Sequence, residues 1–355
     1  MTCSEIIYIL YVNVYVDVEK MKTTIKDVAK KANVSVATVS RVINKLPGYT
    51  QETEKIVLEA IEELGFHPNE LARGLVGKSI KTIGVLIPTL SSMVATEILG
   101  GIEDAAHKNN HSIIICNTDS NGIRTMEYLN ILIKKRINGL LIVSEKINKK
   151  YADAIKKMKI PVVLISTYYD ESMNYIKVHD KKASHDAVEY LIQNGHIDIA
   201  MISGTKDDEV AGISRVSGYM QALGEHGIVI KKENVVYGDF SFESGKICME
   251  SLIKKNADIS AVFCASDEMA AGAISAAYEY GIKVPEQLSI MGYDDTKLAS
   301  MLNPPLTSVS QSFYDIGCRG LDMLISKING NDVKNIIYPH KIIERKTVKA
   351  LLLDH

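Results

Sequence analysis

The chain of 355 residues is poor in the residues from which disulfide frameworks and metal centres are built. Its five cysteines are an odd and scattered set, without a C-x-x-C pair: Cys3, Cys116, Cys248, Cys264 and Cys318. This spacing supports neither a zinc site nor a disulfide scaffold, so we expect buried, reduced thiols. The nine histidines are also dispersed, and none has an evident metal-ligand partner in the sequence. We therefore predict no metal site and no other cofactor.

Sequence motifs of catalysis are lacking as well. The chain contains no P-loop, no G-x-G-x-x-G after a strand, no G-x-S-x-G elbow and no H-E-x-x-H. An enzyme is therefore the weaker alternative for this protein.

Long hydrophobic runs and targeting signals are also missing. Residues 6–18 are apolar but are interrupted by Asn13 and Asp17, and neither a basic n-region nor a small-residue cleavage site flanks them. The segment is too short and too polar to span a bilayer, and it makes a poor signal peptide. With Met21 as the natural start, residues 1–20 would be a non-native or disordered extension, and an added β-strand is the alternative. We predict a cytoplasmic protein without membrane contact.

An overall excess of positive charge is absent too, because the net charge is −2. Basic side chains are instead concentrated in residues 22–45, where Asp27 is the one acidic residue among Lys22, Lys26, Lys30, Lys31, Arg41 and Lys45. Such a local concentration suits a phosphate backbone, whereas the near-neutral total argues against a globally basic nucleic-acid coat.

Residues 24–44 predict two short helices joined by a tight turn. In the first helix, four apolar residues recur at helical spacing: Ile25, Val28, Ala29 and Ala32. Ser35 is a good N-cap for a second helix that starts at Val36 and turns Val39, Val42 and Ile43 inward. A third helix, from the N-cap Thr50 to Gly65, would close the small core with Ile56, Ala60, Ile61 and Leu64.

The outward side of the second helix suits DNA. Small residues at its start would let that end enter the major groove, and Arg41, one turn on, could reach a guanine edge. The DNA contacts predicted in these helices are Thr24, Ser35, Val36, Ala37, Thr38, Arg41 and Asn44. An ordinary helical hairpin with a solvated basic face is the alternative.

From Thr82 onward, strand and helix patterns alternate, which predicts parallel sheets with helices on both faces. The pattern forms two consecutive series, so we expect an α/β fold with two doubly wound lobes and a ligand cleft at the strand carboxyl ends. The predicted strands are residues 83–88, 112–117, 139–143, 162–165, 197–202, 234–238, 261–264 and 289–293.

Polar candidates for a ligand site follow these strands. Asp294 could accept hydrogen bonds from two adjacent sugar hydroxyls, and Arg215 supplies a planar donor fork. Ser266 follows another strand, Gln311 adds an amide, and Phe313 offers a flat face for stacking on a pyranose.

Each candidate has a structural alternative. Asp294 could be the N-cap of a helix before Thr296, Arg215 could form a surface salt bridge, and Phe313 could belong to the core. We expect Asp267 to cap the helix that begins at Glu268 rather than to touch ligand.

The strings D-V-A, V-S and T-V-S-R-V-I-N in residues 24–44 resemble the DNA-binding headpiece of the lactose-repressor (LacI/GalR) family, and nearly all of residues 24–346 resembles that family. The resemblance implies a helix-turn-helix headpiece at residues 21–68 and a hinge helix at residues 69–79. It also implies a core at residues 80–350 that is related to periplasmic sugar-binding proteins. Lobe one would take about residues 80–178 and 311–338, and lobe two about residues 179–310 and 339–350.

In the family, two hinge helices of a dimer enter the minor groove and a leucine wedges into a base step, which kinks the DNA. Leu75 stands at that position, and Lys78 is a further predicted DNA contact. Family members also carry an Asn-Pro-Phe-like run where this chain has residues 91–95, Ser-Ser-Met-Val-Ala. The identity of the effector therefore stays open.

The resemblance implies a homodimeric regulator that binds a pseudo-palindromic operator and a small sugar or sugar-phosphate effector, as a repressor of a carbohydrate-utilisation operon. A transport-type sugar receptor is disfavoured by the headpiece. Another alternative is a global catabolite regulator activated by serine-phosphorylated HPr, since Tyr314-Asp315-Ile316-Gly317 resembles those family members. Where they present an arginine to the phosphate, this chain has Asp322, with Arg319 one turn earlier, which favours the operon-level regulator.

Overall fold

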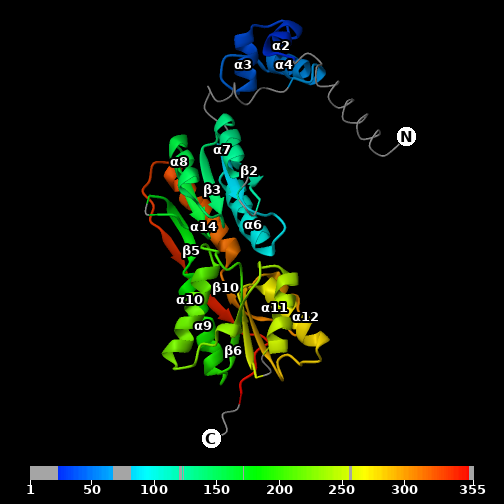
Figure 1. Cartoon of the computed structure of the whole chain (residues 1–355). Helices are drawn as coiled ribbons and strands as arrows, with labels where there is room; N and C mark the ends of the chain where they lie inside the picture. Colours follow the sequence, from blue (N-terminus) through cyan, green and yellow to red (C-terminus); the bar gives the residue numbers. More distant parts are fainter. Residues whose placement is uncertain are drawn as a thin grey trace, which may run out of the picture. The chain divides into compact units, whose positions relative to one another are not determined.

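The computed structural model describes residues 23–66, 81–119, 122, 124–170, 172–255 and 258–351, and the chain forms two compact units, Met1–Ile80 and Lys81–His355 (Figure 1). The predicted extension at residues 1–20 and the predicted hinge at residues 69–79, with Leu75 and Lys78, lie outside the described residues.

The described residues of the first unit, 23–66, contain three helices, α2 (Ile25–Lys31), α3 (Val36–Ile43) and α4 (Gln51–Glu63). Each begins at a hydroxyl-bearing N-cap, namely Thr24, Ser35 and Thr50. The Ser35 and Thr50 hydroxyls each accept a hydrogen bond from an amide that the first helical turn leaves without a partner, whereas the Thr24 amide and hydroxyl donate to the Asp27 carboxylate. The helices enclose a small core that consists of Val28, Ala29, Ala32, Val39, Val42, Val57, Ala60 and Phe66.

The apolar stripe of α4 corrects the prediction by one position. Ile56, which we expected inside, is 44% exposed, whereas the side chain of Val57 is fully buried. Val57, Ala60, Ile61 and Leu64 follow the spacing i, i+3, i+4, i+7 and share one face. Ile56 precedes that face by about 100° of helical rotation and so points outward.

Lobe one of the second unit is a six-stranded sheet in the order β11-β5-β4-β3-β1-β2, with every neighbouring pair parallel. Helices α6 (Met93–Lys108) and α14 (Phe313–Ile328) pack on each other, as do α7 (Thr125–Lys134) and α8 (Lys149–Met158). The strands are β1 (Lys81–Ile87), β2 (His111–Asn117), β3 (Gly139–Val143), β4 (Val162–Ile165), β5 (Asn174–Val178) and β11 (Ile336–Tyr338).

The side chains of these strands alternate between the two faces of the lobe-one sheet, which explains why helices cover both faces. Leu140 packs with the α7 and α8 side, whereas Leu141 packs with the α6 and α14 side. Successive strand residues point to opposite faces, so a strand that is apolar throughout requires helices on both.

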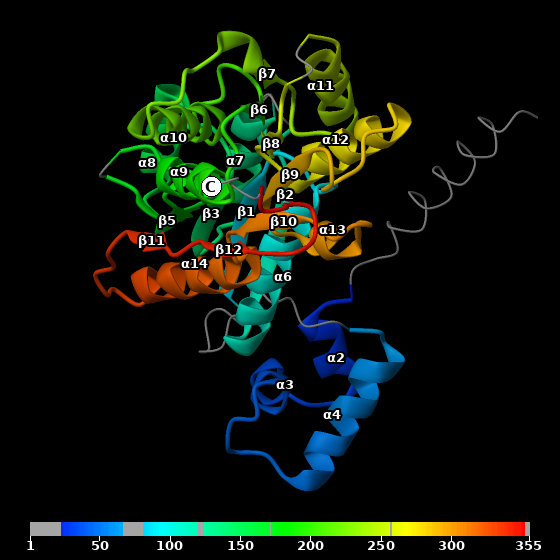
Figure 2. The ribbon, with the colours of Figure 1, turned by 90° about the horizontal axis from the view of Figure 1, so that it is seen from below.

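Lobe two has the strand order β12-β10-β9-β8-β6-β7, and only β12 runs antiparallel to its neighbour, β10. Two helix pairs flank it (Figure 2), α9 (Asp180–Gln193) with α10 (Gly212–Glu225), and α11 (Phe242–Lys255) with α12 (Asp267–Glu279). The remaining elements are β6 (Ile199–Ser203), η2 (Lys232–Asn234), β7 (Val235–Tyr237), β8 (Ala261–Cys264), β9 (Ser289–Asp294), α13 (Lys297–Met301), β10 (Thr307–Ser310) and β12 (Lys341–Ile343).

The chain passes between the two lobes three times. It crosses from β5 into α9, returns from β10 into α14, and crosses again from β11 into β12. Each lobe is thus completed by elements from the C-terminal part of the chain. In the described ranges, no helix has the length and apolar character that a membrane span requires.

Candidate functional site

The outward face of α3 carries a small N-terminal end followed by a cation. Val36 is 41% exposed, Ala37 and Arg41 are exposed, and Thr38 is half-buried. Thr38 Oγ1 lies 2.9 Å from Ser35 Oγ, which also accepts a hydrogen bond from the Thr38 amide at 3.1 Å. Such an end can approach base edges closely, and the guanidinium of Arg41 can bind a guanine through two donors.

Two other predicted DNA contacts lie at helix ends. Thr24 donates from its amide and its hydroxyl to Asp27 Oδ2, at 2.8 and 2.6 Å, and thereby caps α2. Asn44 Nδ2 donates to the Ser40 carbonyl at 2.8 Å at the end of α3. Thr24 stands at the start of α2, where amide groups favour phosphates, whereas Asn44 stands at the carboxyl end of α3, where only its side chain could donate to DNA.

In the second unit, loops that follow strand carboxyl ends of one lobe contact those of the other. Glu97, in α6 after β1, accepts a hydrogen bond from the Lys297 amide, which follows β9, at 3.3 Å. Lys146, after β3, forms an ion pair with Glu209, after β6, at 2.8 Å. The carboxyl edges of the two sheets therefore face each other, which is where open α/β sheets bind ligands.

Arg215 in α10 is buried at this edge. Its Nε and Nη2 donate to Asp180 Oδ1 at 3.2 and 3.1 Å, and its Nη1 donates to the Ala265 carbonyl at 2.5 Å. The guanidinium lies 3.9 Å from the ring centroid of Tyr293. Although burial alone would lower the pKa of Arg215, Tyr293, Asp180 and Asp294 raise it above its ordinary value. The alternative of a surface salt bridge is therefore wrong.

Asp294 ends β9 and is also buried, with a left-handed φ of 111°. Gln311 Nε2 donates to Asp294 Oδ1 at 2.8 Å, and Arg215 Nη1 lies 3.9 Å from the same oxygen. Burial raises the pKa of Asp294 well above its ordinary value, although Arg215 opposes the shift. The N-cap alternative is wrong, because Thr296 holds the N-cap position of α13. Arg215, Asp294 and Gln311 thus form one contiguous polar group.

The helix-capping prediction at α12 is also wrong. Ser266 is the N-cap and accepts a hydrogen bond from the Met269 amide at 3.1 Å. The Asp267 carboxylate instead accepts hydrogen bonds from the Thr296 amide at 2.7 Å and from the Ser308 hydroxyl at 2.6 Å. Burial raises the pKa of Asp267 to about 7. Asp267 therefore ties α12 to two neighbouring segments of lobe two, while the Ser266 hydroxyl is occupied by the cap.

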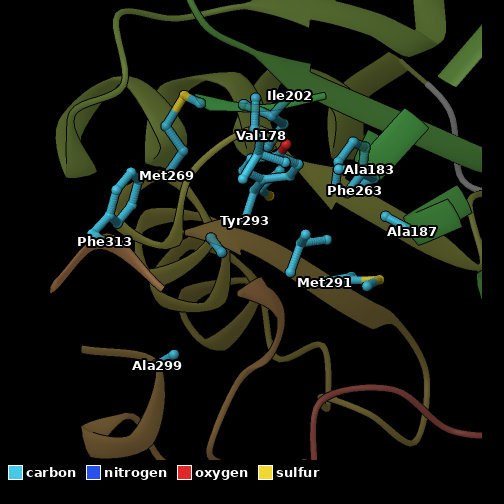
Figure 3. Close-up of a cluster of buried hydrophobic side chains, with 14 of the residues drawn as sticks. Val178, Ala183, Ala187, Ile202, Phe263, Met269, Met291, Tyr293, Ala299 and Phe313 are labelled. Carbon is cyan, nitrogen blue, oxygen red and sulfur yellow. The ribbon is translucent and has the colours of Figure 1, made fainter. Parts of the chain in front are cut away.

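The aromatic residue beside Arg215 is not the one that the sequence suggested. Phe313 is 3% exposed and belongs to the buried cluster that Figure 3 shows, which also contains Met269 and Tyr293. The Phe240 ring centroid lies 6.0 Å from the Arg215 guanidinium carbon. A Cβ on Gly204 would come within 2.0 Å of that ring, so glycine leaves the room that Phe240 occupies. Only its place after β7 could have identified Phe240 in the sequence.

Two hydroxyl groups at the same edges were also missed. Ser203 ends β6 and Ser166 follows β4, and the buried Oγ of each has no hydrogen-bond partner among the described residues. Burying an unpaired hydroxyl is costly, so such groups are available to a bound polar molecule. In the part of the chain that the structure describes, no three His, Cys, Asp or Glu side chains are grouped to hold a metal ion.

Two family models match the chain. The model described as bacterial regulatory proteins, lacI family, matches residues 24–69, and the periplasmic binding protein-like domain matches residues 188–348. Catabolite control protein A of Priestia megaterium is 39% identical over 93% of this chain and all of its own length. RegA of Clostridium saccharobutylicum is 37% identical over 92% of this chain, and the repressor PurR of Pasteurella multocida (strain Pm70) is 36% identical over 93% of it, each over 99% of its own length.

Solved structures agree with these relatives. The lac repressor dimer bound to operator and the anti-inducer ONPF has a TM-score of 0.82 at 29% identity, over 92% of this chain and 99% of its own. The complex of the transcriptional regulator CelR with cellobiose has a TM-score of 0.70 at 27% identity, with the same coverage. The chain has the headpiece and the paired α/β lobes, and its sequence identity extends over the full length of these relatives. It therefore belongs to the lacI family of DNA-binding transcriptional regulators, which are not enzymes.

Proposed function

We propose that the protein is the repressor of a carbohydrate-utilisation operon and that a small sugar or sugar phosphate controls it. The observation that carries the proposal is the buried polar group of Arg215, Asp294 and Gln311 at a strand carboxyl end. Carboxylate, guanidinium and amide groups suit the hydroxyls of a sugar, and buried polar groups reject ligands that cannot pair with them. The cellobiose complex of CelR supports a sugar as the ligand class.

Each side chain has a role in this proposal. Asp294 accepts hydrogen bonds from adjacent ligand hydroxyls, while Arg215 and Gln311 donate. Phe240 gives an apolar face to the sugar ring beside Arg215, a role first assigned to Phe313. Ser203 offers a free hydroxyl from the edge of lobe two. The predicted role of Ser266 is reduced to contact through its backbone, because its hydroxyl caps α12.

For the operator, we propose that α3 enters the major groove with its small N-terminal end and with Arg41. Residues 21–68 would act as the headpiece, residues 69–79 as a hinge with Leu75 and Lys78 on the DNA, and residues 80–350 as the core. Two copies of the chain would bind a pseudo-palindromic site, as symmetric regulators do. The lac repressor is a dimer on its operator, which supports this arrangement.

The lobe contacts suggest how ligand and operator would be coupled. The three chain crossings and the Lys146–Glu209 ion pair would hold the lobes in a defined arrangement. A sugar between the carboxyl edges would favour one arrangement and the operator the other, and the coupling would be reciprocal.

The test is a sugar screen by calorimetry on the wild type and on Asp294→Asn, followed by operator titrations. Asp294→Asn keeps the size of the side chain but replaces one carboxyl oxygen with an NH2 donor, so it should lose the sugar response. Its operator affinity should stay within a few-fold of wild type. An unchanged sugar response would make Asp294 a structural residue, and a wild type that binds no sugar would reject the ligand class.

Global catabolite regulation is the second candidate, because 39% identity to catabolite control protein A extends over that whole protein. On α14, Asp315, Arg319 and Asp322 are all exposed. A phosphoserine carries nearly two negative charges, so the two carboxylates would repel it more than one arginine attracts it. We propose that serine-phosphorylated HPr does not enhance operator binding, and a micromolar enhancement in a titration would favour the global regulator.

A further inference from the structure

The amino edge of the lobe-one sheet carries an unusual concentration of basic side chains. All six strands are parallel, so the residues that precede them lie at one edge. The segments at this edge are the ends of helices and the turns into strands. Ten Lys and Arg residues lie there. Lys327, at the end of α14, is half-buried and donates a hydrogen bond to Asn174. We name the other nine the lysine edge: Lys81, Lys108, Lys134, Lys135, Arg136, Lys156, Lys157, Lys159 and Lys334.

The lysine edge is solvent-accessible. Eight of its side chains are exposed and Lys81 is half-buried. None of the nine takes part in the ion pairs of the described residues, which involve other lysines and arginines. The acidic residues of these segments are Asp332, before β11, and Asp170 and Glu171 in the sequence before β5, and Asp170 interacts with Lys156 at longer range. The charge of this edge therefore stays largely uncompensated within the chain.

Helix stability does not account for this distribution. A cation in the last helical turn interacts favourably with the helix dipole and stabilises the helix, which accounts for Lys108, Lys134 and Lys156. Arg136 and Lys159, however, lie in turns beyond the helix ends with left-handed φ of 53° and 52°. Residues 81–355 as a whole contain 31 Lys and Arg against 33 Asp and Glu, so the basic character is local.

The position of the edge indicates its partner. Strand β1 begins at Lys81, the first residue of the second unit, so the chain leaves the lysine edge toward the headpiece. Fourteen residues, 67–80, separate this edge from the end of the described headpiece. Fully extended, they span at most about 50 Å. A headpiece on DNA would therefore keep the lysine edge within reach of the same duplex.

We propose that the lysine edge is a second, sequence-independent DNA surface that attracts phosphates flanking the operator. Five strand spacings make the edge about 24 Å long, comparable to about seven base pairs of DNA. Each lysine that neutralises a phosphate releases a counterion, so the surface adds affinity that falls with salt. The inference rests on the proposed operator-binding function.

The test uses two variants of the full-length protein that remove the same charge from one helix. K156Q/K157Q alters the last turn of α8, at the lysine edge, and K149Q/K150Q alters its first turn, at the opposite end. All four lysines are exposed, so both variants should fold, which thermal unfolding checks. The probes are a duplex of about 20 base pairs, selected by the wild type from a random library, and the same duplex with about 15 flanking base pairs on each side.

The wild type should bind the long probe several-fold more tightly than the short one, with a steeper salt dependence. K156Q/K157Q should lose most of that difference and flatten the log–log salt slope on the long probe by about 1–2. It should keep its short-probe affinity within twofold, and K149Q/K150Q should match the wild type on both probes.

Equal binding of both probes by the wild type would overturn the inference. The lysine edge would then fit an acidic protein rather than DNA. Equal losses in both variants would also overturn it, because bulk charge alone would then be responsible. A wild type that selects no duplex would reject the proposed operator binding itself, an outcome separate from a missing flank effect.

Discussion

At the scale of single residues, the arginine proposed to contact DNA and the arginine proposed to contact the ligand have opposite environments. Arg41 is exposed on α3 with no ion-pair partner among the described residues, whereas Arg215 is buried and held by Asp180. An exposed arginine can adapt to a base edge, and a buried one presents fixed donors. The sequence could place both on their elements, but not predict Asp180 as the partner, because 34 residues separate the two positions in the chain.

Arg41→Ala should weaken operator binding by about 1–3 kcal/mol and relax the preference at one base pair, since a bidentate guanine contact would be lost. Competition among single-base operator variants measures this. Lys45→Ala, an exposed cation just after α3, is the control and should weaken all sequences alike. If Arg41→Ala behaves like that control, Arg41 contacts only phosphate.

Asp267 should make stability depend on pH. Its pKa is raised to about 7 in the folded protein, above the ordinary 3.8, so the folded state binds more protons than the unfolded state between these values. The free energy of unfolding should therefore fall as pH rises from about 4 to 7, by an amount of the order of 4 kcal/mol.

Denaturant titrations across that pH range measure the effect of Asp267. Asp267→Asn should remove this pH dependence of the free energy of unfolding, because an amide does not titrate. The variant should still fold, because the amide can accept from Thr296 and donate to the Ser308 hydroxyl. An identical pH slope in the variant would show that Asp267 is already ionised at pH 4.

At the scale of elements, the sequence predicted best the strands that are buried in continuous apolar runs. The bounds of β3, β4 and β8 agree with the prediction, because each run is short, apolar and limited by turn residues. Four strands were not predicted: β5, β10, β11 and β12. β5 and β10 mix polar with apolar residues, and β11 and β12 have three residues each with exposed or half-buried side chains, so none shows a long apolar run. Their pairing depends on distant strands, which local periodicity cannot report.

The same limit applies to the candidate site. Asp294 and Gln311 could be identified because they stand at or near strand ends, and Arg215 because its guanidinium is a planar donor fork. Phe240 could not, because its contact with Arg215 depends on the space above Gly204, on a different loop. The helix cap was assigned to Asp267 and is Ser266, which had been predicted to contact the effector, since both residue types cap helices well.

Gly204→Ala should abolish the sugar response by displacing Phe240, because the added Cβ would overlap the ring. Gly224→Ala is the matched control, since no atom lies within 4 Å of the corresponding Cβ. Calorimetry with the responsive sugar should show weakened binding only in Gly204→Ala, with operator affinity retained in both. Normal sugar binding by Gly204→Ala would remove Phe240 from the site.

At the scale of the whole molecule, the lobes are coupled through three crossings and two contacts between their loops. If sugar and operator select different lobe arrangements, each must change the affinity for the other by the same factor. Sugar titrations with and without operator duplex, and operator titrations with and without sugar, measure both factors. Unequal factors would show that the two ligands do not share one equilibrium.

The exchange of elements between the lobes also determines the order in which the protein can be completed during synthesis. Lobe one contains residues 81–178, but its helix α14 and its edge strand β11 come from residues 313–338. Until those residues leave the ribosome, the apolar face formed by α6 and strands β3 to β5 lacks the helix that covers it. Lobe two, whose strand β10 precedes α14, is almost fully synthesised by then. The lobe whose first strands emerge earliest is therefore closed late, and a chain that stops before α14 exposes that face to chaperones and proteases.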